Sequence, residues 1–402
     1  MELVCVVPNI WGPSGDAINE RHMIRMLSLH AKKTIVFTFI HITKIKAFMS
    51  DIANSNFSSS KIIVIGIPEL FPSIYNVFGR IIISFIIALV LWLKSIINKE
   101  KELMIYVRSS YLALGFASLL PSKLVVKIGT LLEDEILGSS FIRLIISKAV
   151  NLCDKIILSK AKVIAVPSPL LYRDLIKRRR IAPAGYICLA PAGIVFDEIA
   201  TYRRAIDTDE FKKTHIIQIC FLGTLIWWQG IDILIKAIAI FKDKYPKVGE
   251  RIHLVIIGDG PERSLIENLC KNLKINYEIT GFLPHKDALK RLACCTALVL
   301  PRRRLSFTEA IIPIKIIEAW ALGVPVVVTR HKILEMFHFK DGEDLVYCEP
   351  TPEDVANALA RIIFSESLRR KLSERGPHIA KLFDYKFISE KLIKVWKANL
   401  TS

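Results

Sequence analysis

The chain has 402 residues, which is too long for one ordinary hydrophobic core and predicts two domains. Its residues are 52% hydrophobic, which excludes a disordered chain. Lysine and arginine number 56 against 38 aspartates and glutamates, for a formal net charge of +18. This charge suggests an anionic partner, either a phosphorylated ligand, an acidic lipid surface or nucleic acid, although a solvated basic surface is the simpler explanation.

The eight cysteines form no C-x-x-C pair, and most of them lie in apolar stretches such as Ile219-Cys220-Phe221. Buried free thiols in a reducing compartment are therefore expected, and a disulfide scaffold is not. Residues 1–7 have no basic start, so no signal peptide is predicted. We expect a cytoplasmic protein, either free or at the inner face of the cell membrane.

The first half of the chain alternates short β-rich runs with longer helical ones. Continuous Val/Ile/Leu runs bounded by turns are typical of buried parallel strands, and the alternation is typical of βαβ units. Strands are predicted at residues 3–8, 34–39, 62–67, 103–107, 124–128 and 163–166, with a first helix at 17–30.

One segment of this half requires a membrane assessment. Residues 81–93, between Arg80 and Lys94, are all apolar except Ser84. This run is shorter than the roughly 20 residues that a spanning helix needs. Three interpretations stay open: a helix lying in a membrane surface, a buried core helix, and a span that extends back across Arg80 to residue 74.

A second βαβ series begins near His215, after the polar stretch 196–214, which we take as an irregular junction. The fold class is therefore α/β, with two tandem doubly wound Rossmann-like domains at residues 1–200 and 201–384. The second series has predicted strands at 216–222, 252–257, 297–300 and 324–328, and predicted helices at 231–241, 261–272 and 314–322. Sheets of this kind bind ligands at the carboxyl ends of their strands, so an interdomain cleft is the expected site.

Glycines occupy the turns at which a ligand would be expected. Gly12 and Gly15 lie between the first strand and the first helix, and Gly258-Asp259-Gly260-Pro261 joins a later strand to a helix. Such glycines let backbone N–H groups approach a phosphate or a sugar. The chain has neither G-x-G-x-x-G nor a P-loop lysine at these turns, so each could equally be an ordinary strand–helix connection.

Two charged residues lie on one face of the predicted helix at 314–322. Lys315 and Glu318 are three residues apart, so their side chains are neighbours on the helix surface. They form either a local ion pair or a charged pair at a ligand site.

The order of these segments resembles glycosyltransferase family 4, a retaining group with the GT-B fold, and in particular a subgroup with a P-x-K-x-x-E motif. The resemblance covers nearly all of residues 215–400 and, more loosely, residues 1–200. Its segments are Pro191-Ala192-Gly193-Ile194, then 223–237 with Gly223 after a strand, Gly258-Asp259-Gly260-Pro261, Gly281-Phe282-Leu283-Pro284, and 313–329 with Glu318-Ala319-Trp320-Ala321-Leu322-Gly323.

The resemblance implies a nucleotide-sugar-dependent hexosyltransferase that needs no metal and no cofactor. Residues 1–200 would form the acceptor side, residues 201–384 would bind the nucleotide sugar, and a C-terminal helix at about 385–402 would pack back on the first domain. Glu318 would accept hydrogen bonds from the ribose hydroxyls. The backbone of Gly281, Phe282 and Leu283 would meet the base. No protein nucleophile is implied.

The chain departs from the family pattern at the groups that neutralise the donor diphosphate. Thr224 and Gln229 stand where the family has an arginine and a lysine. Ala310 stands at the first acid of the E-x7-E motif, with Glu309 beside it.

A diphosphate still needs cations, and other side chains are available to supply them. We hypothesise that Lys315 and the run Arg302-Arg303-Arg304 do so, next to Pro313 and Ile314 at the start of the helix. A solvated basic loop is the alternative interpretation of the arginine run. The candidate catalytic residues are thus Glu318, Lys315 and Glu309.

The expected function is transfer of a sugar from a nucleotide-diphosphate sugar to a glycan or lipid-linked acceptor in cell-envelope glycan or glycolipid synthesis. Peripheral association with an anionic membrane surface is expected, and nucleic acid binding is not. The alternative is a catalytically inactive GT-B scaffold or binding subunit, because the arginine–lysine pair is missing.

Overall fold

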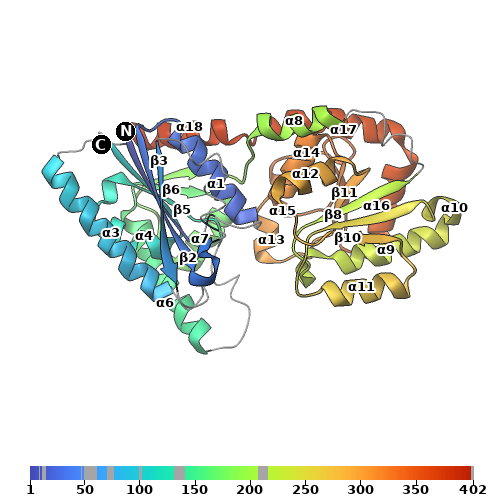
Figure 1. Cartoon of the computed structure of the whole chain (residues 1–402), viewed down its shortest axis with the longest axis horizontal. Helices are drawn as coiled ribbons and strands as arrows, with labels where there is room; N and C mark the ends of the chain where they lie inside the picture. The colour runs from blue at the N-terminus through green and yellow to red at the C-terminus, as the bar shows by residue number, and fades with distance from the viewer. Residues whose placement is uncertain are drawn as a thin grey trace. The chain divides into compact units, whose positions relative to one another are not determined.

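The computed structural model describes residues 1–8, 10, 15–46, 48, 61–69, 77–98, 102–130, 141–206 and 216–399. These residues divide into two compact units (Figure 1). Unit 1 comprises Met1–Pro191 and Tyr385–Ser402, and unit 2 comprises Ala192–Asp384. Each unit is described by itself below.

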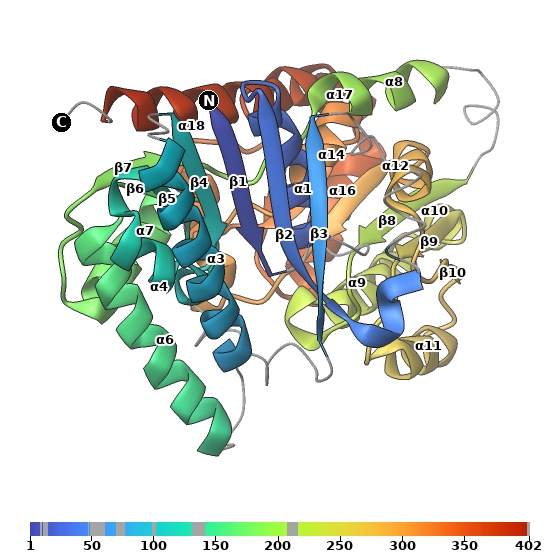
Figure 2. The same ribbon diagram turned by 60° about the vertical axis from the view of Figure 1, so that its left-hand side comes forward.

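Unit 1 is built on a seven-stranded parallel sheet of the order β3-β2-β1-β4-β5-β6-β7. Figure 2 shows β1, β2 and β3 side by side at one edge. The central strands are buried Val/Ile/Leu runs, as expected for a sheet covered on both faces. The strands are β1 (Glu2–Val7), β2 (Lys33–His41), β3 (Ile62–Glu69), β4 (Leu103–Arg108), β5 (Leu124–Lys127), β6 (Val163–Val166) and β7 (Tyr186–Leu189).

The helices of unit 1 connect these strands. One of them illustrates how the sequence defines a helix start, because Ser168 accepts a hydrogen bond from the Leu171 N–H and Pro169 occupies the first helical turn. The helices are α1 (Gly15–Ser28), α3 (Val77–Asn98), α4 (Ser110–Leu119), α6 (Phe141–Lys160), α7 (Pro169–Arg179) and α18 (Tyr385–Ala398). Short 3₁₀ turns lie at Ile42–Lys44 and Pro121–Lys123.

Helix α18 completes unit 1 although it is far from the other elements in sequence. It packs on α1, β6 and β7. Trp396 and Tyr385 are fully buried in this contact, and the Tyr385 hydroxyl donates to Asn19 Oδ1 at 2.7 Å. The buried side of α18, which carries Ile388, Leu392, Ile393 and Trp396, thus lies on the first unit.

Unit 2 has a six-stranded parallel sheet of the order β10-β9-β8-β11-β12-β13. Its strands are β8 (Ile217–Leu222), β9 (Ile252–Ile257), β10 (Tyr277–Ile279), β11 (Ala297–Leu300), β12 (Val326–Thr329) and β13 (Val346–Cys348). Its helices are α8 (Phe196–Ile206), α9 (Ile231–Lys244), α10 (Pro246–Gly249), α11 (Arg263–Asn272), α12 (His285–Ala293), α13 (Ser306–Ala310), α14 (Ile314–Leu322), α15 (Lys332–Met336), α16 (Pro352–Phe364) and α17 (Glu366–Lys381). A 3₁₀ turn lies at Trp227–Gln229.

The predicted fold class, α/β with two Rossmann-like parallel-sheet domains, is confirmed. The predicted strands are all present, and the structure adds β7, β10 and β13. The prediction of an irregular junction at 196–214 was wrong in part, because residues 196–206 form α8, which packs on α12 and α14. The rest of that junction, 207–214, lies outside the described residues. The division between the units accordingly falls after Pro191, not at residue 200.

Helix α3 is longer than the apolar run that predicts it. The helix begins at Val77, before the run 81–93, and continues past Lys94 to Asn98, so it has 22 residues. In the described part of the chain, α3 is the one helix whose length and composition would allow it to cross a membrane, over Gly79–Ile97. It packs along α4 (Figure 1).

Candidate donor-binding site at the carboxyl edge of the second sheet

The loops that follow β8 and β9 are joined through their glycines. The Gly223 N–H donates to Ile257 O at 2.9 Å, and both Gly223 and Gly258 have a φ of +143°. A Cβ on Gly258 would lie 2.1 Å from Gly223 O, so only glycine allows the two chains to approach this closely. These two glycines form a glycine wall at the carboxyl edge, that is, a stretch of closely packed backbone in which Gly223 is half-buried and Gly258 is buried.

The turn after β9 is held mainly by Asp259. Its Oδ1 accepts from the Gly260 N–H at 2.8 Å, and its Oδ2 accepts from Arg263 Nη1 at 2.8 Å. The backbone N–H bond of Gly260, helped by Arg263, lowers the pKa of Asp259. A Cβ on Gly260 would lie 2.5 Å from Leu225 O, so this glycine serves the contact with the loop after β8.

The segment 281–283 lies beside the same loops. Gly281 has a φ of +71° and pairs with Gly258 in an isolated antiparallel bridge. Phe282 is 60% exposed and Leu283 is half-buried. The backbone expected to meet a base is therefore adjacent to the glycine wall.

Lys315, in the first turn of α14, reaches back to the end of β8. Its Nζ donates to Leu222 O at 2.6 Å and to Gln229 Oε1 at 3.1 Å. A Cβ on Gly223 would lie 2.3 Å from this Nζ, so the ammonium group occupies the space that the glycine leaves free. Burial, together with the positive charge of Arg302, lowers the pKa of Lys315 to about 7.

Arg302 is the second cation of this edge. It follows β11, is 7% exposed, and its guanidinium lies over the Trp228 ring at 5.1 Å. Its Nε is buried and has no hydrogen-bond partner, and no carboxylate pairs with it within the described part of the chain. Burial lowers the pKa of Arg302 to about 10.

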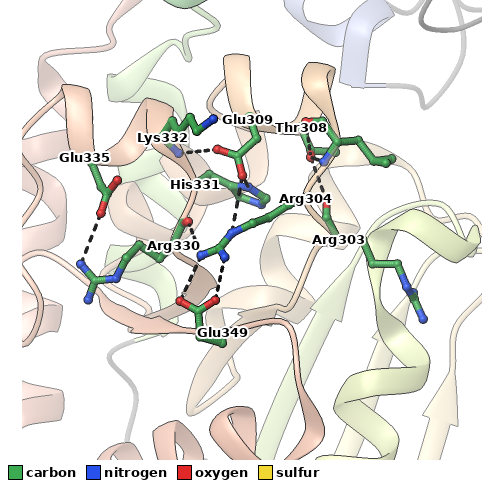
Figure 3. A network of polar contacts seen from close by, with 10 residues as sticks. Arg303, Arg304, Thr308, Glu309, Arg330, His331, Lys332, Glu335 and Glu349 are labelled. Carbon is green, nitrogen blue, oxygen red and sulfur yellow. Dashed lines mark hydrogen bonds and ion pairs between the residues drawn. The ribbon is translucent and has the colours of Figure 1, made fainter.

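Arg303 and Arg304, which complete the arginine run, are engaged elsewhere. Arg303 binds Asp232 with two bonds of 2.9 and 2.7 Å and also donates to Trp227 O. Arg304 binds Glu349 at 2.8 Å (Figure 3). The structure therefore separates Arg302, a buried cation without a counter-ion, from two neighbours that are already neutralised.

Glu309 takes part in the network of Figure 3. Its Oε2 accepts from the Lys332 N–H at 2.7 Å, at the start of α15. Its Oε1 lies 3.5 Å from His331 Nδ1 and 3.6 Å from Arg304 Nε. His331 is 1% exposed, and burial together with Arg302 and Arg304 lowers its pKa to about 3. Glu309 thus connects α13 to α15.

Glu318 is buried in the middle of α14 and is 3% exposed. Its Oε1 lies 2.6 Å from His285 Nε2, at the start of α12. Lys315 and Glu318 therefore have separate partners, and the structure does not show the local ion pair that was one of their two interpretations. A carboxylate oriented by a histidine can still accept hydrogen bonds at its free oxygen.

The other predicted donor residues lie around these groups. Gln229 is buried against Lys315, whereas Thr224 is exposed. Pro313 precedes α14, and Ile314 is its first residue, so both lie at the N-terminus of a helix, where backbone N–H groups favour an anion.

The sequence also predicted two glycines of the first domain, Gly12 and Gly15, as ligand-binding residues. Gly15 is the first residue of α1, and Gly12 lies outside the described residues. The described residues include no group of three or more His, Cys, Asp or Glu side chains arranged to hold a metal ion.

Sequence reasoning missed a buried ionic cluster at the carboxyl edge of the first sheet. Glu20 is fully buried on α1 and accepts from Arg108 at 2.6 Å, Lys127 at 2.9 Å and the Tyr106 hydroxyl at 2.9 Å. Although burial alone would raise the pKa of Glu20, the two cations and the hydrogen bonds lower it to about 2. Only the positions of Arg108 and Lys127 at strand ends could have pointed to it.

Two parallel-sheet α/β units, each with Rossmann-like topology, define the GT-B class of fold. The structure matches that of sucrose-phosphate synthase from Thermosynechococcus elongatus with a TM-score of 0.70, over 99% of both chains at 17% identity. This likeness shows the fold.

The sequence comparisons each match part of the chain. Residues 203–379 match the family model described as glycosyl transferases group 1. The lipopolysaccharide core biosynthesis glycosyltransferase LpsE of Rhizobium meliloti is 30% identical over 156 residues, which are 39% of this chain and 42% of that one. One of the subunits of the human phosphatidylinositol N-acetylglucosaminyltransferase is 27% identical over 192 residues, 47% of this chain and 37% of that one. The matches span less than half the length of these two relatives.

Proposed function

We propose that the protein is a retaining glycosyltransferase that moves a sugar from a nucleotide-diphosphate sugar to a lipid-linked or glycan acceptor. The observation that carries the proposal is the pair Arg302 and Lys315 at the carboxyl edge of the second sheet. Both are cations without a carboxylate partner within the described part of the chain.

A buried cation without a counter-ion is costly, and the cost is offset when an anion binds. Arg302 and Lys315 are close enough for the charge of Arg302 to lower the pKa of Lys315. Lys315 is in the first turn of α14, and the N-terminus of this helix adds positive potential at the site. A diphosphate fits this site because its negative charge would serve as the counter-ion that both cations lack.

Arg302 and Lys315 could also replace the arginine and lysine of the family pattern, which are Thr224 and Gln229 in this chain. Gln229, which replaces the family lysine, is buried and accepts from Lys315 Nζ at 3.1 Å. A lysine at 229 would instead place a second ammonium group against Lys315. We propose that Arg302 and Lys315 stabilise the leaving diphosphate in place of the missing pair, without a metal ion.

The remaining donor contacts follow from the neighbouring groups. Glu318, oriented by His285, would accept hydrogen bonds from the ribose hydroxyls, and the backbone at 281–283 would face the base. In this proposal Glu309 is a positioning residue that holds α13 against the start of α15, because its carboxylate accepts a hydrogen bond from the Lys332 N–H.

The acceptor is proposed on different grounds. The names of the two relatives refer to a lipopolysaccharide core and to phosphatidylinositol, both of which are lipid-based acceptors. These names support a lipid-linked acceptor presented at a membrane face, in cell-envelope glycan or glycolipid synthesis, with a cytoplasmic enzyme.

The test is thermal unfolding with a panel of UDP-, GDP- and ADP-sugars. A donor at about 100 times its dissociation constant should stabilise the fold by roughly 2.7 kcal/mol. Arg302→Met and Lys315→Met should each weaken binding and so remove most of the shift. Arg370→Met is the matched control, because Arg370 is exposed and pairs with Glu374 on its own helix. A wild-type protein that shifts with no nucleotide sugar would refute the proposal and favour a scaffold or binding subunit.

A further inference from the structure

Helix α3 of unit 1 has one face turned inward and one turned outward. The inward face carries Arg80, Ser84, Ala88 and Leu91, which are buried, and α3 packs along α4 through it. The approach is close, because a Cβ on Gly115 of α4 would lie 2.7 Å from the Phe85 backbone. The helix is thus firmly docked on the unit.

The outward face is wholly apolar. Six of its side chains are between 46% and 78% exposed: Ile82, Ile86, Leu89, Val90, Leu93 and Ile97. At 100° per residue these positions fall in one sector about 100° wide that runs for roughly 23 Å. No polar side chain lies in this sector, because Arg80 and Ser84 point inward and Lys94 turns to Glu2.

We propose that this outer face of α3 inserts into the surface of an anionic lipid bilayer, with the helix axis parallel to the membrane plane. A soluble protein rarely exposes a contiguous apolar surface of this extent without a partner. An in-plane amphipathic helix buries such a face at the boundary between headgroups and acyl chains. The inference names the partner surface of the enzyme proposed above and rests on that function only for its biological purpose.

The anchors of α3 favour an in-plane helix over a spanning one. Arg80 binds Glu69 of β3 with two bonds of 2.6 and 2.7 Å, and both side chains are buried. Arg80 also donates to the Tyr111 hydroxyl at 3.3 Å and lies over the Phe39 ring at 5.1 Å. A spanning helix would have to break this buried pair and leave Glu69 without its cation, a change that costs several kcal/mol in comparable cases.

Charge favours a bilayer over a second copy of the chain as the occupant. Lys94 is 39% exposed at its side chain on the flank of the outer face, and Lys123 approaches Ser95 at the same end. The segment that follows the helix, Lys99-Glu100-Lys101-Glu102, is neutral as a whole, and the chain carries a net charge of +18. Two copies of a chain with this charge repel each other, whereas an anionic bilayer attracts it.

The first experiment is flotation of the full chain with vesicles of phosphatidylcholine containing phosphatidylglycerol. The triple variant Ile86→Gln, Leu89→Gln and Leu93→Gln should weaken partitioning about 100-fold, because three apolar side chains no longer leave water. The matched control is a second triple variant at exposed leucines elsewhere, Leu29→Gln, Leu265→Gln and Leu382→Gln, each 61–74% exposed in the wild type. It should bind vesicles as the wild type does.

The second experiment measures the depth of α3 in the bilayer. Nitroxide labels at Ile82→Cys, Leu89→Cys and Ile97→Cys, each in a Cys294→Ser background, report their access to oxygen and to a water-soluble nickel complex. Equal depths at the three sites support the in-plane helix. A label at residue 89 much deeper than those at residues 82 and 97 would overturn it in favour of a span.

Two further outcomes would overturn the inference. One is equal vesicle binding by the wild type and the outer-face triple variant. The other is no vesicle binding together with a wild-type dimer that the triple variant converts to a monomer, which would assign the face to a second copy. Donor binding is measured separately by thermal unfolding, so vesicle binding without a donor shift would refute only the proposed activity.

Discussion

Protonation of Lys315 should be coupled to donor binding. In the free protein, burial and the charge of Arg302 lower the pKa of this lysine from 10.5 to about 7. A diphosphate placed against its Nζ would favour the charged form and raise the pKa again. Binding should therefore take up a proton above pH 7.

The expected number of protons taken up follows from the protonation of Lys315 in the free protein and in the complex. At pH 8 a group with a pKa of about 7 is roughly 10% protonated, and in the complex it would be nearly fully protonated, so binding takes up about 0.9 proton. The affinity for the donor should then fall about tenfold for each pH unit above 7. The stability of the free protein should respond in the opposite sense. The unfolded lysine keeps its proton up to about pH 10.5, so this group makes the fold more stable as pH rises from 7 to 10.5.

The assay is isothermal titration calorimetry of a nucleotide sugar at pH 8 in two buffers that differ in their heat of ionisation. The dependence of the measured enthalpy on the buffer heat gives the number of protons taken up. The variant Lys315→Met should bind more weakly and take up almost none. Arg370→Met, far from the candidate site in sequence and exposed, should behave as the wild type does.

One result would refute the reasoning. If the wild type binds the donor at pH 8 with no proton uptake, Lys315 is either charged before binding or distant from the diphosphate. The same conclusion follows if wild type and Lys315→Met take up equal numbers of protons.

Two further predictions concern stability and the glycine wall. Gly223→Ala should weaken donor binding at least tenfold while the fold is kept, because the alanine Cβ would displace Lys315 Nζ and a φ of +143° is strained for alanine. The thermal shift with donor measures this effect. The control is Gly79→Ala, where a Cβ meets nothing within 4 Å. Glu20→Gln should destabilise unit 1 by on the order of 3–5 kcal/mol, because it leaves Arg108 and Lys127 without their shared carboxylate, and hydrogen exchange of β4 and β5 peptides measures it. The loss should be full above about pH 4.5 and should shrink as the pH falls toward 2, since the pKa of Glu20 is lowered to about 2; equal exchange in both proteins at pH 7 would contradict this prediction.

Most of the fold could be predicted because the buried strands are continuous runs of Val, Ile and Leu bounded by turns. The strands that escaped prediction are short. β10 has three residues, Tyr277–Ile279, all half-buried, and β13 has three, Val346–Cys348. Segments of three residues are too short to show the hydrophobic periodicity of a strand. Helix α8 escaped because its sequence is charged and its apolar face meets α12 and α14, which are distant in sequence.

The candidate site could be located from the sequence but not resolved into partners. The turns after β8 and β9 were identified by their glycines, which local geometry requires. The pairing of Arg303 with Asp232 and of Glu318 with His285 could not be read, because strand order brings together residues far apart in the chain. For the same reason the sequence treated three consecutive arginines alike, whereas the structure leaves only Arg302 without a carboxylate partner in the described part of the chain.

The return of α18 to unit 1 has a consequence for biosynthesis. Unit 1 needs Tyr385 and Trp396 to fill the surface formed by α1, β6 and β7, yet these residues are translated only after all of unit 2. At about 5–20 residues per second, the ribosome needs roughly 10–40 s to pass from residue 191 to residue 385. During that interval the nascent first sheet lacks its closing helix, while unit 2, which is continuous in sequence, can fold without waiting. Completion of unit 1 is therefore a late docking step, and the apolar surface that α18 covers stays open while unit 2 is translated.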